Sequence, residues 1–273
     1  MNLRALAAPV LAGAFAAVMA LPAWADAARL AEVLKLGEVV DILHDEGMVY
    51  ADTIEADMLP NGGGAFWTQT IARLYDRGAM TRALTDTLES DMSDAQIADS
   101  IAFFDTDQGQ SILSFENAAR AAMSDPEIEQ IARAAYADLR ADGDDRLDQI
   151  DRFVEANDLI ERNVAGALSS QYQFFRGLAD GGAFNMTDED ILADVYGQEP
   201  EIRTDTEEWL FGFLLMAYQP LSDEAMEAYI AFSGTDGGKA LNAALFEGFE
   251  RMYRDISFGL GLAASRAMTG SDL

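Results

Sequence analysis

Apolar residues recur at spacings of three and four along most of the chain, which is the pattern of one buried face on an α-helix. No run of residues alternates with a period of two between hairpin turns, and Val and Thr are sparse. The sequence therefore predicts an all-α fold. Three of the predicted helical faces are formed by Leu30, Val33, Leu34, Val40 and Leu43, by Ile128, Ile131, Ala135 and Leu139, and by Leu147, Ile150, Phe153 and Val154.

Proline and glycine divide the predicted helices. Pro60 precedes three consecutive glycines, Pro126 follows a capping Asp125, and Pro220 ends a strongly apolar segment. The Asp142–Asp145 segment, Asp-Gly-Asp-Asp, is the best candidate for a seam within the chain. These breaks predict two units, residues 26–145 and residues 146–273.

The two predicted units share a sequence block. Residues 92–109 align without a gap on residues 221–238, and the glycine segment 63–66 reappears at 181–184. Repetition of this kind indicates related structural units, so we expect two pseudo-repeated antiparallel helical units. The identical pairs in the longer block are Ser93/Ser222, Asp94/Asp223, Ile101/Ile230, Ala102/Ala231, Phe103/Phe232, Thr106/Thr235, Asp107/Asp236 and Gly109/Gly238.

Each block is typical of a helical hairpin. A serine at the start caps the first helix, and the later threonine caps the second helix. The glycine three residues after that threonine lowers helix propensity, so we expect it to permit close approach of the two helices. The motif is accordingly interpreted as structural. Its residues are Ser93, Phe103, Thr106 and Gly109 in the first block and Ser222, Phe232, Thr235 and Gly238 in the second.

The N-terminus has the pattern of a secretory signal peptide. Arg4 precedes an uncharged apolar run, and Ala23-Trp24-Ala25 is a typical cleavage site. The alternative is an uncleaved membrane anchor, but the apolar run is shorter than the ~20 residues that a spanning helix needs. We expect residues 1–25 to be removed after Ala25 and the rest to be a periplasmic protein. It has no cysteine, so neither a lipid-modified cysteine nor a disulfide is expected.

The chain is strongly acidic, with a formal net charge of −30. Loss of Arg4 with the signal peptide would make the exported chain more acidic by one unit. Nucleic-acid binding needs clustered Lys and Arg, and anionic lipid attracts basic segments, so both are disfavoured. The charge is typical of a highly soluble protein, and a cationic partner is the alternative explanation.

The capped helix, the Ala-Phe pair, the short turn and the glycine-initiated helix resemble those of a known family. Residues Met92–Leu113, and more weakly Leu221–Leu241 with the following Tyr253–Ile256, are similar to exported bacterial proteins that carry "domain of unknown function 2059". The resemblance implies an all-helical periplasmic protein. It brings no catalytic residues.

The residues give little support for catalysis by a metal or by a nucleophile. His44 is the only histidine and there is no cysteine, so the usual zinc ligands are missing. No Gly-x-Ser-x-Gly motif accompanies His44, which is interpreted as a surface residue. The segment 138–149 has Arg140 and Gln149 where a calcium loop needs acidic ligands. No metal and no cofactor is predicted.

Two classes of function stay open. We favour a non-enzymatic binding, chaperone-like or envelope-maintenance protein, and the alternative is a helical hydrolase of cell-wall glycan that uses a carboxylate pair. With 48 acidic residues, a candidate pair arises by chance, so no catalytic residue is assigned. A ligand pocket is expected between the two units. The aromatic candidates for its wall, near the glycine segments, are Phe66, Trp67, Tyr172 and Phe184.

Two further segments have alternative interpretations. The predicted helix from Lys239 to Met268 is apolar and rich in small residues, so it forms either the core of the second unit or a face for a homodimer or another protein partner. The acidic stretch Asp188–Arg203 carries the extra residues of the second unit, which mark either a functional loop or a tolerated insertion.

Overall fold

A computed structural model describes residues 23–270, which form α-helices joined by short turns and contain no strand. The all-α prediction is confirmed. The predicted signal peptide lies outside the described residues except for residues 23–25, which begin the first helix. The helices are α1 (Ala23–Val33), α2 (Leu36–Met58), α3 (Gly64–Leu74), α4 (Arg77–Asp91), α5 (Asp94–Phe104), α6 (Asp107–Met123), α7 (Pro126–Asp142), α8 (Asp145–Asn157), α9 (Leu159–Asp180), α10 (Asp188–Gly197), α11 (Glu199–Tyr218), α12 (Asp223–Ser233) and α13 (Asp236–Thr269).

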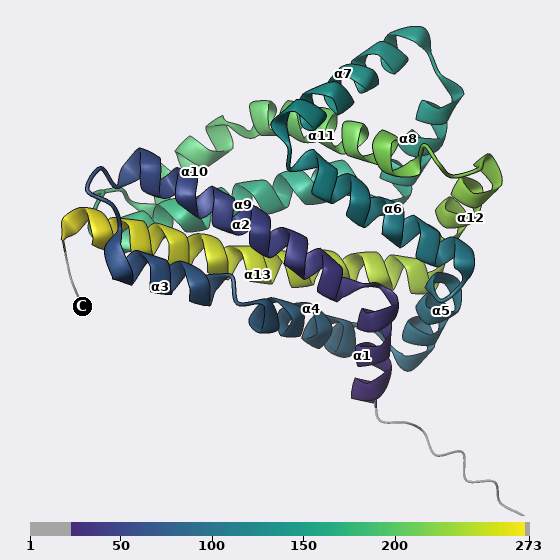
Figure 1. Cartoon of the computed structure of the whole chain (residues 1–273), viewed down its shortest axis with the longest axis horizontal. Helices are drawn as coiled ribbons and strands as arrows, with labels where there is room; N and C mark the ends of the chain where they lie inside the picture. Colours follow the sequence, from purple (N-terminus) through teal and green to yellow (C-terminus); the bar gives the residue numbers. More distant parts are fainter. Residues whose placement is uncertain (1–22, 271–273) are drawn as a thin grey trace, which may run out of the picture.

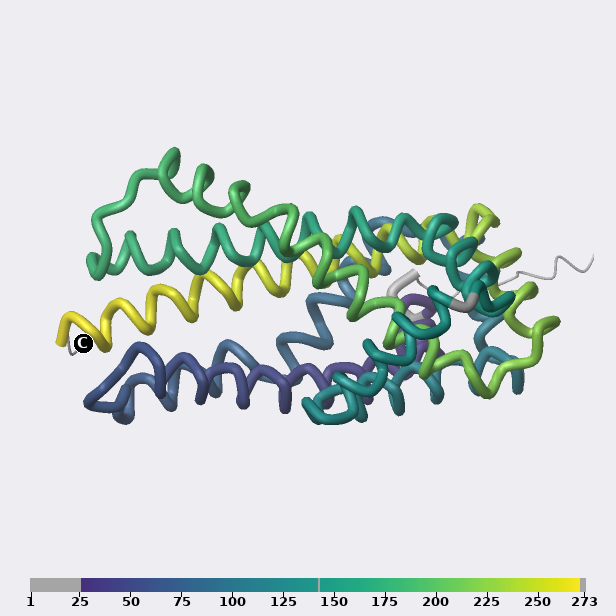
Figure 2. Tube along the Cα trace, turned by 90° about the horizontal axis from the view of Figure 1, so that it is seen from above, coloured from purple at the N-terminus to yellow at the C-terminus, as the bar shows by residue number. Residues whose placement is uncertain are grey.

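Helix α13, with 34 residues, is the central element of the fold. It runs along the longest axis of the molecule, and it packs against α9, α4, α5 and α3. Figure 2 shows that, towards its C-terminal end, α2 and α3 lie on one side of it and α9 and α10 on the other. Its apolar stripe, which includes Leu241, Met252, Ile256 and Leu260, is buried within this chain. The stripe is therefore part of the core of this chain.

The close pairing of α9 with α13 depends on two glycines. A Cβ atom on Gly261 of α13 would lie 2.0 Å from the carbonyl oxygen of Phe174. A Cβ atom on Gly177 of α9 would lie 2.3 Å from the carbonyl oxygen of Phe258. Each glycine therefore faces the backbone of the other helix, and this crossing leaves no room for a side chain on either side.

The hydrophobic core is shared between the two predicted units. One cluster combines apolar residues of α1 to α5 with the buried face of α13, including Leu84 and Leu260. A second cluster combines α6 and α7 with α8, α11 and α12, including Ile112 and Leu214. Both clusters cross the seam at Gly143, where the backbone is left-handed with φ 71°. The seam is thus a boundary between helices within a shared core.

We expect residues 26–145 expressed alone to lose most of their helical circular dichroism, because their core cluster would lack the side chains of α13. Adding residues 146–273 as a separate chain should restore the helical signal per residue that the joined chain 26–273 gives. Cooperative melting of 26–145 alone, at the temperature of the joined chain, would contradict this expectation.

The repeated block forms two capped helical hairpins, α5–α6 and α12–α13. Ser93 and Ser222 accept hydrogen bonds from backbone N–H groups in the first turns of α5 and α12. At the second helices, Thr106 Oγ1 accepts from the N–H of Gly109, and Thr235 Oγ1 accepts from the N–H of Gly238, both at 3.0 Å.

The glycine of each hairpin lies against the end of the preceding helix. A Cβ atom on Gly109 would lie 2.5 Å from the carbonyl oxygen of Phe103. A Cβ atom on Gly238 would lie 2.1 Å from the carbonyl oxygen of Phe232. The absence of a side chain therefore lets each hairpin turn close tightly.

The two hairpins contact each other reciprocally. The rings of Phe103 and Phe232, which occupy the same position in the two blocks, stack with centroids 4.3 Å apart. Gln108 of the first hairpin donates to the carbonyl oxygen of Ala225 in the second. In return, a Cβ atom on Gly237 would meet the carbonyl oxygen of Gln96 at 3.5 Å. Such exchange of equivalent contacts is the geometry of twofold pairing.

The turn between the first two helices has the same backbone conformation in both predicted units. Lys35 precedes α2 with φ 55°, and Asp158 precedes α9 with φ 53°. They are the only non-glycine residues with a positive φ in the part of the chain that the structure describes. These correspondences support the pseudo-repeat, which stays a prediction.

Helix α7 differs from its predicted face. Ile131 is 63% exposed and Ala135 is exposed, whereas Ala132 and Tyr136 are buried. The prediction of Ile131 and Ala135 as core positions was wrong, because α7 packs on α11 through the stacked rings of Tyr136 and Phe211, 4.7 Å apart. One large aromatic pair thus fixes which face of a short helix is buried.

Candidate functional site

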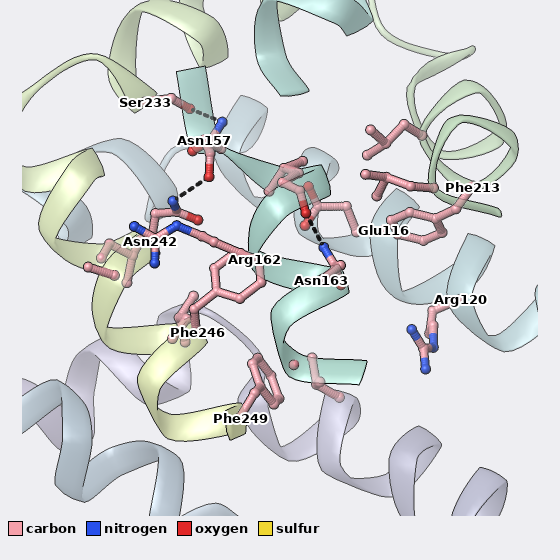
Figure 3. Close-up of a pocket in the computed structure, with 18 of the residues that line it drawn as sticks. Glu116, Arg120, Asn157, Arg162, Asn163, Phe213, Ser233, Asn242, Phe246 and Phe249 are labelled. Atoms are coloured by element: carbon pink, nitrogen blue, oxygen red, sulfur yellow. Dashed lines mark hydrogen bonds between the residues drawn. The ribbon is translucent and has the colours of Figure 1, made fainter. Parts of the chain in front are cut away.

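A cavity of about 820 Å³ lies between the two predicted units. Its walls come mainly from α6, α8, α9, α11, α12 and α13, with Val39 and Leu43 of α2 added. Figure 3 shows side chains from these helices around a common space. Most of the lining residues are apolar or aromatic, among them Trp209, Phe213, Leu214, Leu241, Phe246 and Phe249. The volume lies in the range of small-molecule sites.

Glu116 of α6 is a half-buried acid that lines this cavity. Its Oε1 accepts hydrogen bonds from the hydroxyls of Tyr218, at 2.6 Å, and Tyr229, at 3.2 Å. Enclosure by the surrounding protein raises the pKa of the carboxyl from 4.5 to about 7, because burial disfavours the ionised form more than the two hydroxyls stabilise it. The carboxyl is thus poised to change its charge near neutral pH.

The two tyrosines are held in place by aromatic contacts. The ring of Phe153 meets that of Tyr218 edge-on at 5.5 Å and that of Tyr229 at 4.7 Å. Burial is the main cause that raises the pKa of both phenols well above 10, and the Glu116 charge adds to it. Both phenols therefore stay neutral and act only as hydrogen-bond donors to Glu116.

Arg120, one turn further along α6, already has a partner. Its Nε and Nη2 donate to the two carboxylate oxygens of Glu46 at 2.8 and 2.6 Å. Its guanidinium also lies over the ring of Trp209, 4.9 Å from the centroid, and Trp209 stacks on Phe213. This arrangement ties α6 to α2 and α11 and leaves the charge of Arg120 compensated.

Arg162 of α9 is the second cation in the cavity wall. Its guanidinium lies over the ring of Phe246 at 5.4 Å, and its Nε lies 3.9 Å from a carboxylate oxygen of Asp158. That Nε is fully enclosed and makes no hydrogen bond within the described part of the chain. A ligand in the cavity cannot reach it, because the atom has no accessible surface.

A small network of polar side chains forms one corner of the cavity. Asn157 is buried, and its Nδ2 donates to the carbonyl oxygen of Phe153 and to the hydroxyl of Ser233. Asn242 donates to the carbonyl oxygen of Asn157 at 2.8 Å. These bonds, two of which Figure 3 marks, fix α8 and α12 against the start of α13.

The four aromatic residues predicted for a pocket wall do not line this cavity. Both Trp67 and Phe66 belong to α3. Trp67 is buried in the hydrophobic cluster that α1 to α5 form with α13, and Phe66 packs against this cluster. Tyr172 is half-buried on α9, and Phe184 is 43% exposed in the turn after it. Their value as ligand contacts stays a prediction.

The sequence signals for the lining residues were weak. Of the hairpin motif, Phe232 and Gly238 line the cavity. Glu116 is one of 48 acids in the chain and has no distinguishing motif around it. Its environment comes from tyrosines more than 100 positions away, so no local pattern could identify it.

His44, interpreted as a surface residue, is instead half-buried. Its Nδ1 donates to the carbonyl oxygen of Tyr75 at 2.7 Å, at the end of α3. The side chain therefore joins α2 to α3 and has a structural role.

Comparison with known families gives one match. Residues 78–138 match the model of a family described as "Uncharacterized protein conserved in bacteria (DUF2059)". The chain carries a DUF2059 region. The resemblance predicted from residues 92–113 is confirmed, and the weaker one of residues 221–241 stays a prediction.

The DUF2059 region spans α4 to α7 and includes Glu116 and Arg120. It therefore contributes one wall of the cavity. No curated protein and no solved structure matches the chain.

Two further observations concern the described residues. Residues 23–270 contain no group of three or more His, Cys, Asp or Glu side chains placed to hold a metal ion. Within the same range, no helix combines the length and the apolar character needed to cross a membrane.

Proposed function

We propose that this chain is an exported, non-enzymatic binding protein whose cavity holds a small molecule with a large apolar body. The observation that carries the proposal is the cavity of about 820 Å³, which aromatic and aliphatic side chains of both predicted units line. A cavity of this size can bury most of the surface of a small molecule. Burial of apolar surface then supplies the binding free energy.

The alternative, hydrolysis of cell-wall glycan, needs two carboxyl groups that flank the reacting bond. Glu116 has the environment of a general acid, because its pKa is raised to about 7. The other acids in the lining are Glu247, which is 43% exposed and paired with Arg251, and the exposed Glu250. A binding role therefore fits the cavity better than a two-carboxylate mechanism does.

The location proposed for this protein is the bacterial periplasm. The support is the apolar N-terminal run with its Ala23-Trp24-Ala25 cleavage pattern and the match of residues 78–138 to a bacterial family. A binding protein in that compartment would act on molecules that have crossed the outer membrane or have been released from the envelope.

Filling the cavity should abolish binding of an apolar molecule. Ser170 lines the cavity and makes no hydrogen bond within the described residues, so Ser170→Trp is expected to place an indole in it. We expect at least a tenfold loss of affinity for the neutral fluorescent probe N-phenylnaphthylamine, because the indole occupies space that the ligand needs.

Ser169→Trp is the matched control. Ser169 is the preceding residue on α9, is also half-buried and does not line the cavity. The control should bind the probe as the unchanged protein does, and circular dichroism should show that both variants are folded. Equal binding by both variants, or no binding of the probe by the unchanged protein, would contradict the proposed function.

A further inference from the structure

The charges in the cavity wall suggest which kind of molecule it accepts. Besides the more exposed Glu247 and Glu250, the charged residues of the lining are Glu116, Arg120 and Arg162. In a cavity with apolar walls, an uncompensated charge is costly, so a ligand that compensates it gains affinity. The question is therefore which of these groups lacks a counter-ion.

Both arginines already lie beside a carboxylate. Arg120 has the two carboxylate oxygens of Glu46 and the ring of Trp209. Arg162 has the carboxylate of Asp158, 3.9 Å from its Nε, and the ring of Phe246, and that Nε is closed off from the cavity. An anionic ligand would have to compete with these carboxylates.

Glu116 has no counter-ion among the described residues. The groups that face it are the hydroxyls of Tyr218 from α11 and Tyr229 from α12, and both are neutral. No charged side chain shifts its titration, although Arg120 lies on the same helix. Glu116 is thus a half-buried acid of this wall that has no counter-ion within residues 23–270.

One oxygen of Glu116 is available to a ligand. Both tyrosines donate to Oε1, whereas Oε2 receives no hydrogen bond from residues 23–270. The fully enclosed polar side-chain atoms without a partner in that range are Arg162 Nε and Gln171 Oε1. Oε2 is not one of them, so it keeps a surface open to the cavity that Glu116 lines.

The aromatic rings of the cavity wall and the net negative charge of the chain also favour a positively charged ligand. Phe213, Phe249 and Tyr253 bring aromatic rings to the cavity, and the face of an aromatic ring attracts a cation. The net charge of −30 gives the protein a negative potential that attracts cations to it and repels anions.

We infer that the cavity binds an amphiphilic organic cation, an ammonium group on an apolar body, whose charge pairs with Oε2 of Glu116. This inference rests on the proposed function and names the class of molecule. The apolar body then lies along Phe246 and Phe249 of α13.

Binding of such a cation is coupled to the release of a proton. Near neutral pH a large fraction of Glu116 is protonated, and only the carboxylate form pairs with an ammonium group. The carboxyl therefore gives its proton to the buffer when the cation enters, and the net charge of the site does not change. Affinity should fall roughly tenfold from about pH 8 to about pH 6, in proportion to the ionised fraction.

Three probes with the same alkyl chain test the inference on the chain 26–273: decyltrimethylammonium, decanol and decanoate. By titration calorimetry at about pH 7 we expect the cation to bind at least tenfold more tightly than the alcohol, and decanoate to bind more weakly than the alcohol. Calorimetry in two buffers of different ionisation enthalpy should show proton release with the cation only.

Glu116→Gln keeps an oxygen for the two tyrosine hydroxyls and removes the charge. It should bind the cation no better than the alcohol, show no proton release, and bind decanol as before. Glu89→Gln is the matched control, because Glu89 is an exposed glutamate of α4 that does not line the cavity. It should keep both the preference for the cation and the release of a proton.

The outcomes separate the two proposals. If decanol and the cation bind equally, or if Glu116→Gln leaves the preference unchanged, the inference about Glu116 is wrong while the proposed function stands. Tightest binding by decanoate would assign the cavity to anions instead. If none of the three probes binds, the proposed function fails as well.

Discussion

Replacing Glu116 with glutamine is expected to raise the free energy of unfolding by about 3 kcal/mol at about pH 8 and to leave it nearly unchanged at about pH 4. The folded protein raises the pKa of this carboxyl from 4.5 to about 7. In the pH range between these two values, the folded state holds a proton that the unfolded state has lost. Stability is therefore lost as the pH rises through that range, and a neutral glutamine avoids the loss.

Urea unfolding followed by circular dichroism at the two pH values measures this difference. Glu250→Gln removes the same charge at an exposed position, so we expect it to change stability by less than about 0.5 kcal/mol at both pH values. A gain for Glu116→Gln that is equal at both pH values would show that the effect is not ionisation. A loss at about pH 8 would show that the charged carboxylate stabilises the fold.

Gly261→Ala is expected to destabilise the protein by about 3 kcal/mol. The added methyl would lie 2.0 Å from the carbonyl oxygen of Phe174, which is backbone of α9 and cannot rotate away. The helices must therefore separate along the most extensive pairing in the fold. Urea unfolding measures the loss, and the circular dichroism of the native state shows whether helix content is kept.

Gly166→Ala is the matched control for this substitution. Gly166 lies in the interior of α9, and a Cβ atom there would meet nothing within 4 Å. The higher helix propensity of alanine should therefore stabilise the protein by about 0.5–1 kcal/mol. If Gly261→Ala gave the same gain as Gly166→Ala, the close crossing of α9 and α13 would not exist in solution.

The parts of the fold that depend on short stretches of sequence could be predicted. The helix starts at Ser93, Thr106, Ser222 and Thr235 follow from residues whose side chains bond the backbone two or three positions on, which is a local interaction. Helical periodicity likewise needs only a window of residues.

The candidate site could not be predicted in the same way. The cavity has walls from helices spread over more than 200 positions, so its existence depends on how those helices pack. The pKa of Glu116 depends on the enclosure that this packing produces. The wrong prediction of the buried face of α7 has a related cause. Tyr136 is buried and Ile131 is exposed because the ring of Tyr136 stacks on Phe211, which lies on a different helix.

The alignment of the two blocks has a consequence for the cavity. When it is continued into the second helix of each hairpin, Glu116 of α6 corresponds to Leu245 of α13, and Arg120 corresponds to Phe249. All four line the cavity. At these corresponding positions the side chains are charged on α6 and apolar on α13. An elongated ligand with one polar end would consequently bind in a single orientation, with its polar end towards α6 and its apolar end towards α13.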